Sequence, residues 1–428
     1  MNNFFKLKEH NVTIKSEFIA ALTSFFAAVY IIIVNASILS DANIPIEPLI
    51  IATILASLCG CLLVGLLSNT PLIVMPGMGI NALFTYTIIN TLGLNFYEAL
   101  AAVFVSGVLF TIIALTPLSD ILTKAIPKSL KEAITVGIGI FIAFIGFQKA
   151  GLIVSDPSTL IKLGNITSPH VLSFLFTMII TTILFLKKIP GSFLISIIIG
   201  TLVSFGFGIV DFTNISYSLP NFSQYKDILF NISFSAIGKT SFWISVFSIT
   251  LVIVFENIGL LHGQVSELLK APDKTPRALT AIAFSVIGCS LFGTSPSVST
   301  VEGTAGIAAG GKTGLTSIIT GFLFLISLFF ISFISKIPNA AISPILIIIG
   351  CLMVQNLKHM NFDDLTELFP AFITIILIPL TYSIVDGIAF GFILYPLCKL
   401  ITKKGRDVSF PMYLSSFIFL IYFLLQAL

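Results

Sequence analysis

Long apolar runs alternate with short polar stretches along the whole chain. Twelve of these runs are uniform enough to cross a membrane as helices, since one crossing needs about 20 predominantly apolar residues. They lie near residues 18–38, 47–68, 98–117, 128–148, 170–187, 190–210, 239–262, 275–292, 315–335, 338–357, 365–383 and 384–402. The pattern predicts an all-α polytopic membrane protein.

Two further stretches at membrane depth are interrupted by Pro and Gly. They lie within 70–90, which contains TPLIVMPGMGINALF, and within 294–312, which overlaps GTSPSVSTVEGTAGIAAGGKTG. Non-helical backbone is tolerated at this depth only where protein buries it or where it lines a cavity. Such interrupted segments in both halves of a transporter are typical of a substrate site. We expect each to be a short extended piece, near 72–75 and 296–299, followed by a half-helix, which brings the number of transmembrane segments to about fourteen.

The distribution of basic residues tests this count. With a cytoplasmic N-terminus, all but five of the 22 Lys and Arg residues fall on the cytoplasmic side, as positive-inside topology requires. The bias arises only if both interrupted segments cross the membrane. The exceptions are Lys149, Lys162, Lys226, Lys239 and Lys336. We therefore expect a multi-pass protein of the plasma membrane, the inner membrane in a bacterium, and the basic N-terminus shows no cleavable signal peptide.

Landmarks recur at nearly constant spacing in the two halves. Asn35 precedes Pro76 by 41 residues, and Glu256 precedes Pro296 by 40 residues. Seven segments per half is an odd number, so the second half would enter the membrane from the opposite side, as in a 7+7 inverted repeat; chance alignment of prolines is the alternative. The two extended pieces have backbone groups without partners, so we expect them to pair with one another near the bilayer midplane. Both half-helices would then direct their N-termini at a common cavity.

Composition excludes several other classes of protein. The chain is 56% hydrophobic and 10% charged, with a mean hydropathy of +1.08, which leaves no room for a soluble domain. The five cysteines lie in apolar runs, so we expect them to be small hydrophobic residues. The net charge of +3 reflects lysines beside the membrane, so we expect no nucleic acid as partner. Residues 306–313 match the phosphate-binding pattern GxxxxGK[ST], but no strand precedes them in an α/β domain, so we reject a nucleotide site. We predict no enzyme, no catalytic residue, no metal and no cofactor.

Two carboxylates stand out at membrane depth. Glu256 lies deep in the apolar run ITLVIVFENIGLLHG, where a carboxylate costs about 2.5–3.5 kcal/mol and usually has a function. Its structural alternative is bonding to backbone N–H groups of a neighbouring broken helix. Glu302 lies at the start of the second half-helix, where we favour ligand contact. The alternative is a capping box with Ser299, which the Ser-x-x-Glu spacing also fits.

Polar residues nearby complete the candidate substrate site. Asn81, in the first turns of the other half-helix, either donates to a ligand or satisfies exposed backbone. Asn35 corresponds to Glu256 under the repeat, and site and helix packing are equal alternatives for it. Ser299 and Thr300 belong to the second extended piece and its end. Asp386, at the start of the last segment, is predicted to be an N-cap.

Several motifs together carry a family resemblance. AVYIIIVNASIL (28–39), GMGINA (77–82), EGTAGIAAGGKTGLT (302–316) and DGIAFGFI (386–393) resemble the AzgA-like purine permeases, the adenine/guanine/hypoxanthine branch of the nucleobase–ascorbate transporter superfamily. The resemblance implies that Glu256 and Glu302 contact a purine whose uptake is coupled to protons. Two departures leave the exact purine open: FENIGLL (255–261) stands where the family usually has a sequence like FDTTGTL, and Thr300-Val301 stands where it often has Tyr-Ile.

The resemblance also implies a division into a core and a gate. The core would comprise segments 1–4 (18–117) and 8–11 (239–335), and the gate segments 5–7 (118–210) and 12–14 (336–403). The remaining parts are a cytoplasmic N-terminus (1–17), an outside loop (211–238) and a C-terminal apolar segment (404–428). Residues 408–428 could form a fifteenth span or a helix on the bundle or in the interface.

The chemistry of purine bases fits these candidates. A carboxylate accepts hydrogen bonds from ring or amino N–H groups, and half-helix amides donate to carbonyl or ring nitrogen atoms. We therefore expect import of adenine, guanine and/or hypoxanthine through the bilayer by proton symport, with the proton as coupling ion and Glu256 as the residue linked to it. The alternatives are another nucleobase (xanthine or uracil), a small anion, which two carboxylates would repel, and a membrane-embedded enzyme. A homodimer is left open.

Overall fold

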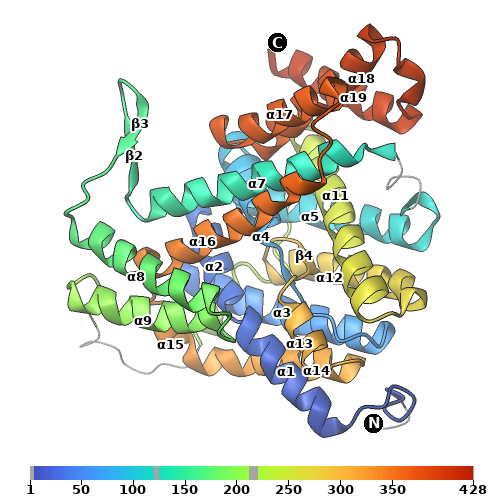
Figure 1. The fold of residues 1–428 in the computed structure, drawn as a ribbon. Coiled ribbons are helices and arrows are strands. Elements are labelled where there is room, and N and C mark those ends of the chain that lie inside the picture. Colours follow the sequence, from blue (N-terminus) through green and yellow to red (C-terminus); the bar gives the residue numbers. More distant parts are fainter. Residues whose placement is uncertain (1–3, 120–124, 212–219, 428) are drawn as a thin grey trace.

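The computed structural model describes residues 4–119, 125–211 and 220–427, which form a bundle of helices around a small central sheet (Figure 1). The all-α polytopic fold predicted from the sequence is confirmed. Each of the twelve uniform apolar runs is a helix, and these are α1 (Ile14–Ala28) continued by α2 (Tyr30–Leu39), α3 (Ile46–Leu67), α5 (Phe96–Leu115), α7 (Lys128–Lys149), α8 (Pro169–Leu186), α9 (Ser192–Gly206), α11 (Thr240–Leu261), α12 (Thr275–Phe292), α14 (Gly314–Ile326) continued by α15 (Ile331–Ile334), α16 (Asn339–Val354), α17 (Leu365–Leu380) and α18 (Ile384–Ile401).

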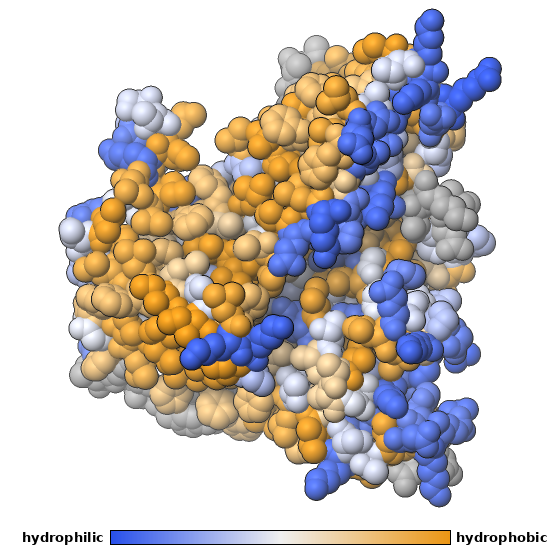
Figure 2. All heavy atoms as spheres, in the orientation of Figure 1, coloured by the Kyte–Doolittle hydropathy of each residue, from blue (hydrophilic) through white to orange (hydrophobic). Residues whose placement is uncertain are grey.

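Most of these helices match the dimensions of a bilayer. Within the described residues, ten helices are long and apolar enough to cross a membrane, and α9 and α17 are shorter apolar helices. Large apolar side chains such as Phe176, Ile179 and Ile183 project outward from α8. Figure 2 shows hydrophobic surface over the flank of the bundle, with hydrophilic residues gathered mainly along the margin where the N-terminus lies. This arrangement suits a protein surrounded by lipid.

Local signals in the sequence explain where several helices begin. Asn95 accepts a hydrogen bond from the Glu98 amide at 2.9 Å and the Glu98 carboxylate accepts one from the Asn95 amide, so α5 opens with a capping box. Ser168 caps α8, whose first residue is a proline. The N-cap predicted at Asp386 is wrong: Ser383 caps α18 and accepts from the Asp386 amide. A cap must precede the first helical turn, and Asp386 lies inside that turn.

The two interrupted segments meet at the centre of the bundle. Strand β1 (Val74–Pro76) pairs antiparallel with β4 (Ser297–Ser299), with Val74 opposite Ser299 and Pro76 opposite Ser297. The predicted pairing of the extended pieces is confirmed. β1 leads into α4 (Met78–Ala82) and the π-helix η2 (Leu83–Thr91), whereas β4 leads into the shorter α13 (Gly303–Ala308). Both strands are fully buried, so the pairing satisfies backbone groups that lipid could not.

The helices pack in two sets. In one, α3, α5, α11, α12 and α14 pack together with α1. In the other, α7 packs on α16 and α17, α8 on α9 and α16, and α17 on α18. The C-terminal segment forms α19 (Phe410–Ala427), which packs on α18 and touches α11. The ring of Phe419 contacts those of Phe247 and Phe392, and the Tyr422 hydroxyl donates to Asp386 at 2.9 Å.

Short elements complete the structure. A hairpin of β2 (Ile153–Asp156) and β3 (Leu160–Leu163) projects between α7 and α8 (Figure 1). The remaining elements are the helix α10 (Phe222–Tyr225), the π-helix η3 (His262–Leu268) and the 3-10 turns η1 (Ser40–Ala42), η4 (Pro272–Lys274), η5 (Ser327–Phe330), η6 (Gln355–His359) and η7 (Gly405–Asp407).

Candidate functional site

Glu256 lies on α11, which packs against β4 and α4 at the centre of the bundle. Its side chain is partly exposed, and within the described part of the chain its carboxylate has no hydrogen bond or ion pair. Gly259 and Gly263 follow at helical spacing on the same face, and a Cβ at either position would meet no atom within 4 Å. Glu256 therefore lies on a helix face that borders open space, and the alternative of a carboxylate bonded to a broken helix is not observed.

The residue after Glu256 holds the central sheet. The Asn257 side chain accepts a hydrogen bond from the Ser299 amide at 3.0 Å, and Gln264, seven residues later, donates to the Thr300 carbonyl at 2.7 Å. Gln264 also accepts from the Ser299 hydroxyl at 2.6 Å. These two amides bind the free edge of β4, which would otherwise be unsatisfied at membrane depth. Sequence reasoning missed both, although two amides seven residues apart in an apolar helix lie on one face and were a usable signal.

Glu302 lies between β4 and α13, at the N-cap position of that helix. Its carboxylate accepts a hydrogen bond from the hydroxyl of Tyr30, which is fully buried and packs edge-on against Phe193 of α9. The capping box with Ser299 is not formed, because the Ser299 hydroxyl donates to Gln264 and no side chain caps α13. The neighbouring Val301 side chain is 62% exposed, so open space also borders this segment.

Asn35 and Asn81 meet through a serine at the other end of β4. Asn35 donates to Thr53 at 2.7 Å and to Thr294 at 3.0 Å. The Ser295 hydroxyl lies 2.6 Å from the Asn81 side-chain oxygen and 3.2 Å from that of Asn35. All of these side chains are fully buried. They form a polar cluster that joins the start of the first half-helix to the residues before β4.

One atom in this cluster has no partner. The side-chain nitrogen of Asn81 is buried and makes no hydrogen bond to the described residues. A buried donor without an acceptor costs about 1–3 kcal/mol. Asn35, by contrast, has partners on both its nitrogen and its oxygen. The structure therefore leaves a buried donor without a partner on Asn81, whereas the side-chain nitrogen and oxygen of Asn35 are both hydrogen-bonded.

Thr300 has its backbone fully engaged. Its amide donates to the Ile73 carbonyl at 2.9 Å, and its carbonyl accepts from Gln264. The structure thus brings Ser299, Thr300 and Glu302 together at one end of β4, beside α11 and Glu256. Asn35 and Asn81 lie with Ser295 at the other end.

Cations are scarce around the two carboxylates. Within the described residues no Lys, Arg or His forms an ion pair with Glu256 or Glu302. The ammonium of Lys131 lies 5.5 Å from the ring centre of Phe255, the residue before Glu256. A site with carboxylate acceptors, an amide donor and open space between helices suits a small polar ligand that carries N–H groups.

Comparison with known proteins places the chain in a family. The model of the Permease family (Xan_ur_permease) matches residues 15–390. The nucleobase transporter PlAzg2 of Paenibacillus larvae is 48% identical over 386 residues, which cover 90% of this chain and 77% of that protein. The guanine/hypoxanthine permease PbuO of Bacillus subtilis is 39% identical, covering 94% and 96%, and the adenine permease AdeP of Escherichia coli is 34% identical, covering 96% and 92%.

Solved structures share the fold at low sequence identity. The transmembrane domain of the cyanobacterial bicarbonate transporter BicA superposes with a TM-score of 0.69 at 15% identity, over 87% of this chain and 97% of that domain. SLC26A9 superposes with a TM-score of 0.65 at 13% identity, over 92% and 66%. At such identity the likeness shows the fold alone. With the family match and the permease relatives, it follows that this chain is a multi-pass membrane transporter and not an enzyme, and that it belongs to the Permease family as an AzgA-like member.

Proposed function

We propose that this protein is a secondary active transporter that imports purine nucleobases, namely adenine, guanine and/or hypoxanthine, together with protons. The observation that supports this most is the pair Glu256 and Glu302, which lie beside the paired strands, border open space and form no ion pair with the described part of the chain. The relatives named as guanine/hypoxanthine and adenine permeases point to the same class of substrate.

The site offers both kinds of hydrogen-bonding group that a purine needs. Glu256 and Glu302 accept from ring or amino N–H groups, and the free amide nitrogen of Asn81 donates to a carbonyl or ring nitrogen. Ser299, Thr300 and Asn35 complete the site as its frame, because their polar groups bind Gln264, Asn257 and the Ser295 cluster. A small anion is disfavoured, since both carboxylates would repel it.

Glu256 is the residue we assign to proton coupling. Its carboxylate binds none of the residues that the structure describes, whereas that of Glu302 accepts a hydrogen bond from Tyr30. A neutral carboxyl group is far cheaper at membrane depth than a carboxylate. Binding a proton and a neutral base together would therefore favour movement of the loaded site across the bilayer.

Movement of a core (18–117 and 239–335) against a gate (118–210 and 336–403) would carry the site. Polar side chains contribute to the contacts between these parts. Lys149 pairs with Asp41 at 2.7 Å, and the Ile384 amide donates to the Thr87 hydroxyl at 3.0 Å. These contacts must break when the two parts move.

Uptake measurements test the proposal. Labelled adenine, guanine, hypoxanthine, xanthine and uracil are offered to permease-deficient cells that express the protein, with and without a proton gradient. We expect accumulation of unchanged purine that the gradient drives. Glu256→Gln should abolish that dependence, while Glu9→Gln, at an exposed position paired only with Lys6, should behave as wild type. Uptake of xanthine or uracil in place of these purines, competition by bicarbonate or sulfate, or proton-driven uptake by Glu256→Gln would contradict it.

A further inference from the structure

A third buried carboxylate, Glu17, lies near the start of α1 and is fully inaccessible to solvent. It accepts five hydrogen bonds from the segment that opens α14. The donors are the Lys312 amide at 3.0 Å, the Thr313 amide at 3.4 Å and hydroxyl at 2.8 Å, and the Thr316 amide at 3.2 Å and hydroxyl at 2.6 Å. Within the described residues no cation pairs with it. Its charge is balanced by backbone and hydroxyl donors at a helix N-terminus.

This arrangement explains the phosphate-binding pattern at residues 306–313. In a nucleotide-binding loop, successive backbone amides before a helix form a nest for an anion. Here the amides of Lys312, Thr313 and Thr316 form such a nest, and the carboxylate of Glu17 occupies it. The pattern thus corresponds to a real anion site, filled from within the chain. We call residues 312–316 the anion nest.

The helix that carries Glu17 also touches the half-helix that follows Glu302. α1 packs along both α13 and α14. A Cβ at Gly306 would lie 1.9 Å from the Ser24 hydroxyl and 3.1 Å from the Ala20 carbonyl, so α1 and α13 are in close contact at that point. Directly after α1, Tyr30 donates to Glu302. The thirteen residues from Glu17 to Tyr30 span about 20 Å of helix.

α13 needs this external support. It has only six residues, and a helix of that length is unstable alone because nucleation is costly. It is held at one end by Tyr30 on Glu302, in the middle by contact with Ser24, and beyond its other end by Glu17 in the anion nest. We infer that Glu17 is a positioning residue: by occupying the anion nest it fixes α1 along α13, and α1 then holds Glu302 in place through Tyr30.

Chemical rescue tests this inference in purified, reconstituted protein. Glu17→Ala empties the nest, and formate, a one-carbon carboxylate, is the probe that can refill it. We expect the KM for purine to rise about tenfold in Glu17→Ala, a loss of about 1.4 kcal/mol in binding, and to fall again with formate. Formate should also raise the melting temperature of Glu17→Ala, because it binds only the folded state. Chloride at the same ionic strength is the salt control.

Two variants serve as controls. Glu17→Gln fills the nest with a neutral group, so formate should change neither its KM nor its melting temperature. Glu9→Ala removes an exposed carboxylate from the same N-terminal region and should behave as wild type. If Glu17→Ala does not reach the membrane, Thr313→Ala combined with Thr316→Val removes two hydroxyl donors while the carboxylate stays. Its KM should rise, and a wild-type KM would overturn the inference.

The KM measurements rest on the proposed function, whereas the melting temperature does not. If wild-type protein takes up no purine, the proposed function fails, and the formate-dependent melting temperature still tests the nest. If formate does not raise the melting temperature of Glu17→Ala, residues 312–316 do not bind a carboxylate and the anion nest is overturned. A melting shift without recovery of KM, or a wild-type KM in Glu17→Ala, would overturn the positioning role.

Discussion

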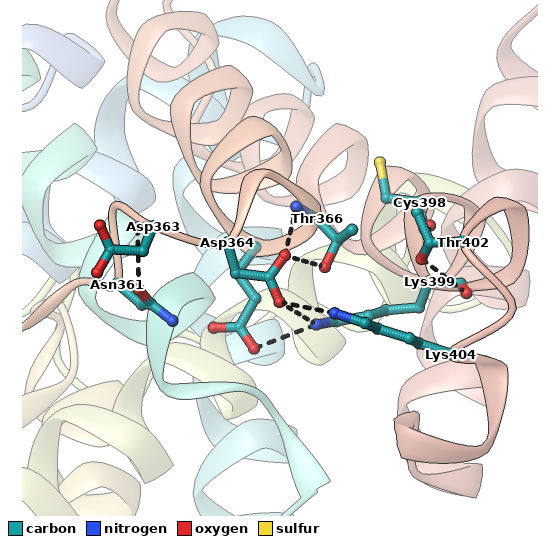
Figure 3. Close-up of polar contacts among 9 residues, drawn as sticks. Asn361, Asp363, Asp364, Thr366, Cys398, Lys399, Thr402 and Lys404 are labelled. Carbon is teal, nitrogen blue, oxygen red and sulfur yellow. Dashed lines mark hydrogen bonds and ion pairs between the residues drawn. The ribbon is translucent and has the colours of Figure 1, made fainter.

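The protein holds its carboxylates in two contrasting ways. At the centre, Glu256 and Glu302 have no cation partner among the residues that the structure describes. Where the start of α17 lies beside the end of α18, Asp364 and Glu367 share the ammonium of Lys399, which lies 3.3 Å from each and is only 5% exposed (Figure 3). Lys404 adds a second contact to Asp364 at 3.6 Å. Glu256 and Glu302 thus border open space, whereas the charges of Asp364 and Glu367 are neutralised within a network of lysines.

This difference separates function from stability. A carboxylate without a cation at membrane depth is costly and usually has a function. A network of ion pairs at the ends of two helices joins them, and its charges are already satisfied. We therefore expect substitutions at the centre to change uptake with little loss of stability, and substitutions in the network to do the reverse.

The largest effect on uptake is expected for Glu302→Gln. The amide keeps the shape of the side chain and can still accept from Tyr30, but it removes the charge that we assign to purine binding. Uptake should fall by about ten- to a hundredfold, the range of losing a hydrogen bond to a charged group. The melting temperature should stay the same or rise, because a buried charge is gone. Normal uptake by Glu302→Gln together with a lowered melting temperature would show that Glu302 serves stability and not function.

The largest effect on stability is expected for Lys399→Met. This change leaves Asp364 and Glu367 facing each other without their shared cation, and both are partly solvated, so the loss should be about 1–2 kcal/mol. Thermal unfolding of the purified protein should show a lower melting temperature, while uptake per folded molecule stays normal. Lys404→Met, at a more exposed position, is the control and should have a smaller effect. Loss of uptake in Lys399→Met without loss of stability would place this network in the transport mechanism.

Local signals allowed the centre of the fold to be predicted from sequence. Pro76 and Pro296, with the glycines after them, mark backbone that cannot remain helical, and membrane depth leaves each extended piece only the other as partner. Glu256 could be singled out for the same reason, since a carboxylate in an apolar helix is costly. The N-cap at Asp386 was wrong because Ser383, three residues earlier, competes for the same role.

Contacts between distant segments could not be predicted. Tyr30 and Glu302 are 272 positions apart, and Glu17 and Thr316 are 299 apart. Each of these side chains has an ordinary local explanation. A tyrosine in an apolar helix, such as Tyr30, can be a membrane-facing aromatic residue, and a glutamate in the first turn of a helix, such as Glu17, can complement the helix dipole. Only the packing of α1 along α13 and α14 shows what these side chains bind. The hairpin of β2 and β3 was missed because its strands are only four residues each.

A smaller effect is expected for Tyr30→Phe, which tests how far Glu302 depends on the Tyr30 hydroxyl. The ring and its contact with Phe193 remain, and only the hydroxyl that donates to Glu302 is lost. The KM for purine should rise about fivefold, less than for Glu302→Gln, because the hydroxyl acts on purine binding only through the position of Glu302. Kinetics of uptake at several substrate concentrations measure this. An unchanged KM would show that Glu302 is held without Tyr30.

The smallest effect is the response of the end network to acid. The Thr366 hydroxyl and amide, followed by Lys399, hold the pKa of Asp364 below its usual range. Because the folded pKa is lower than the unfolded value of about 3.9, the stabilisation is complete above that value and is lost as the pH falls through the folded pKa. The melting temperature should thus be steady near neutral pH and decline below about pH 4, and Asp364→Asn should make that decline shallower. The same variant should leave the pH dependence of uptake unchanged, because we assign the coupled proton to Glu256 at the centre and not to this network. A shift of the uptake profile in Asp364→Asn would mean that the two groups of carboxylates are coupled.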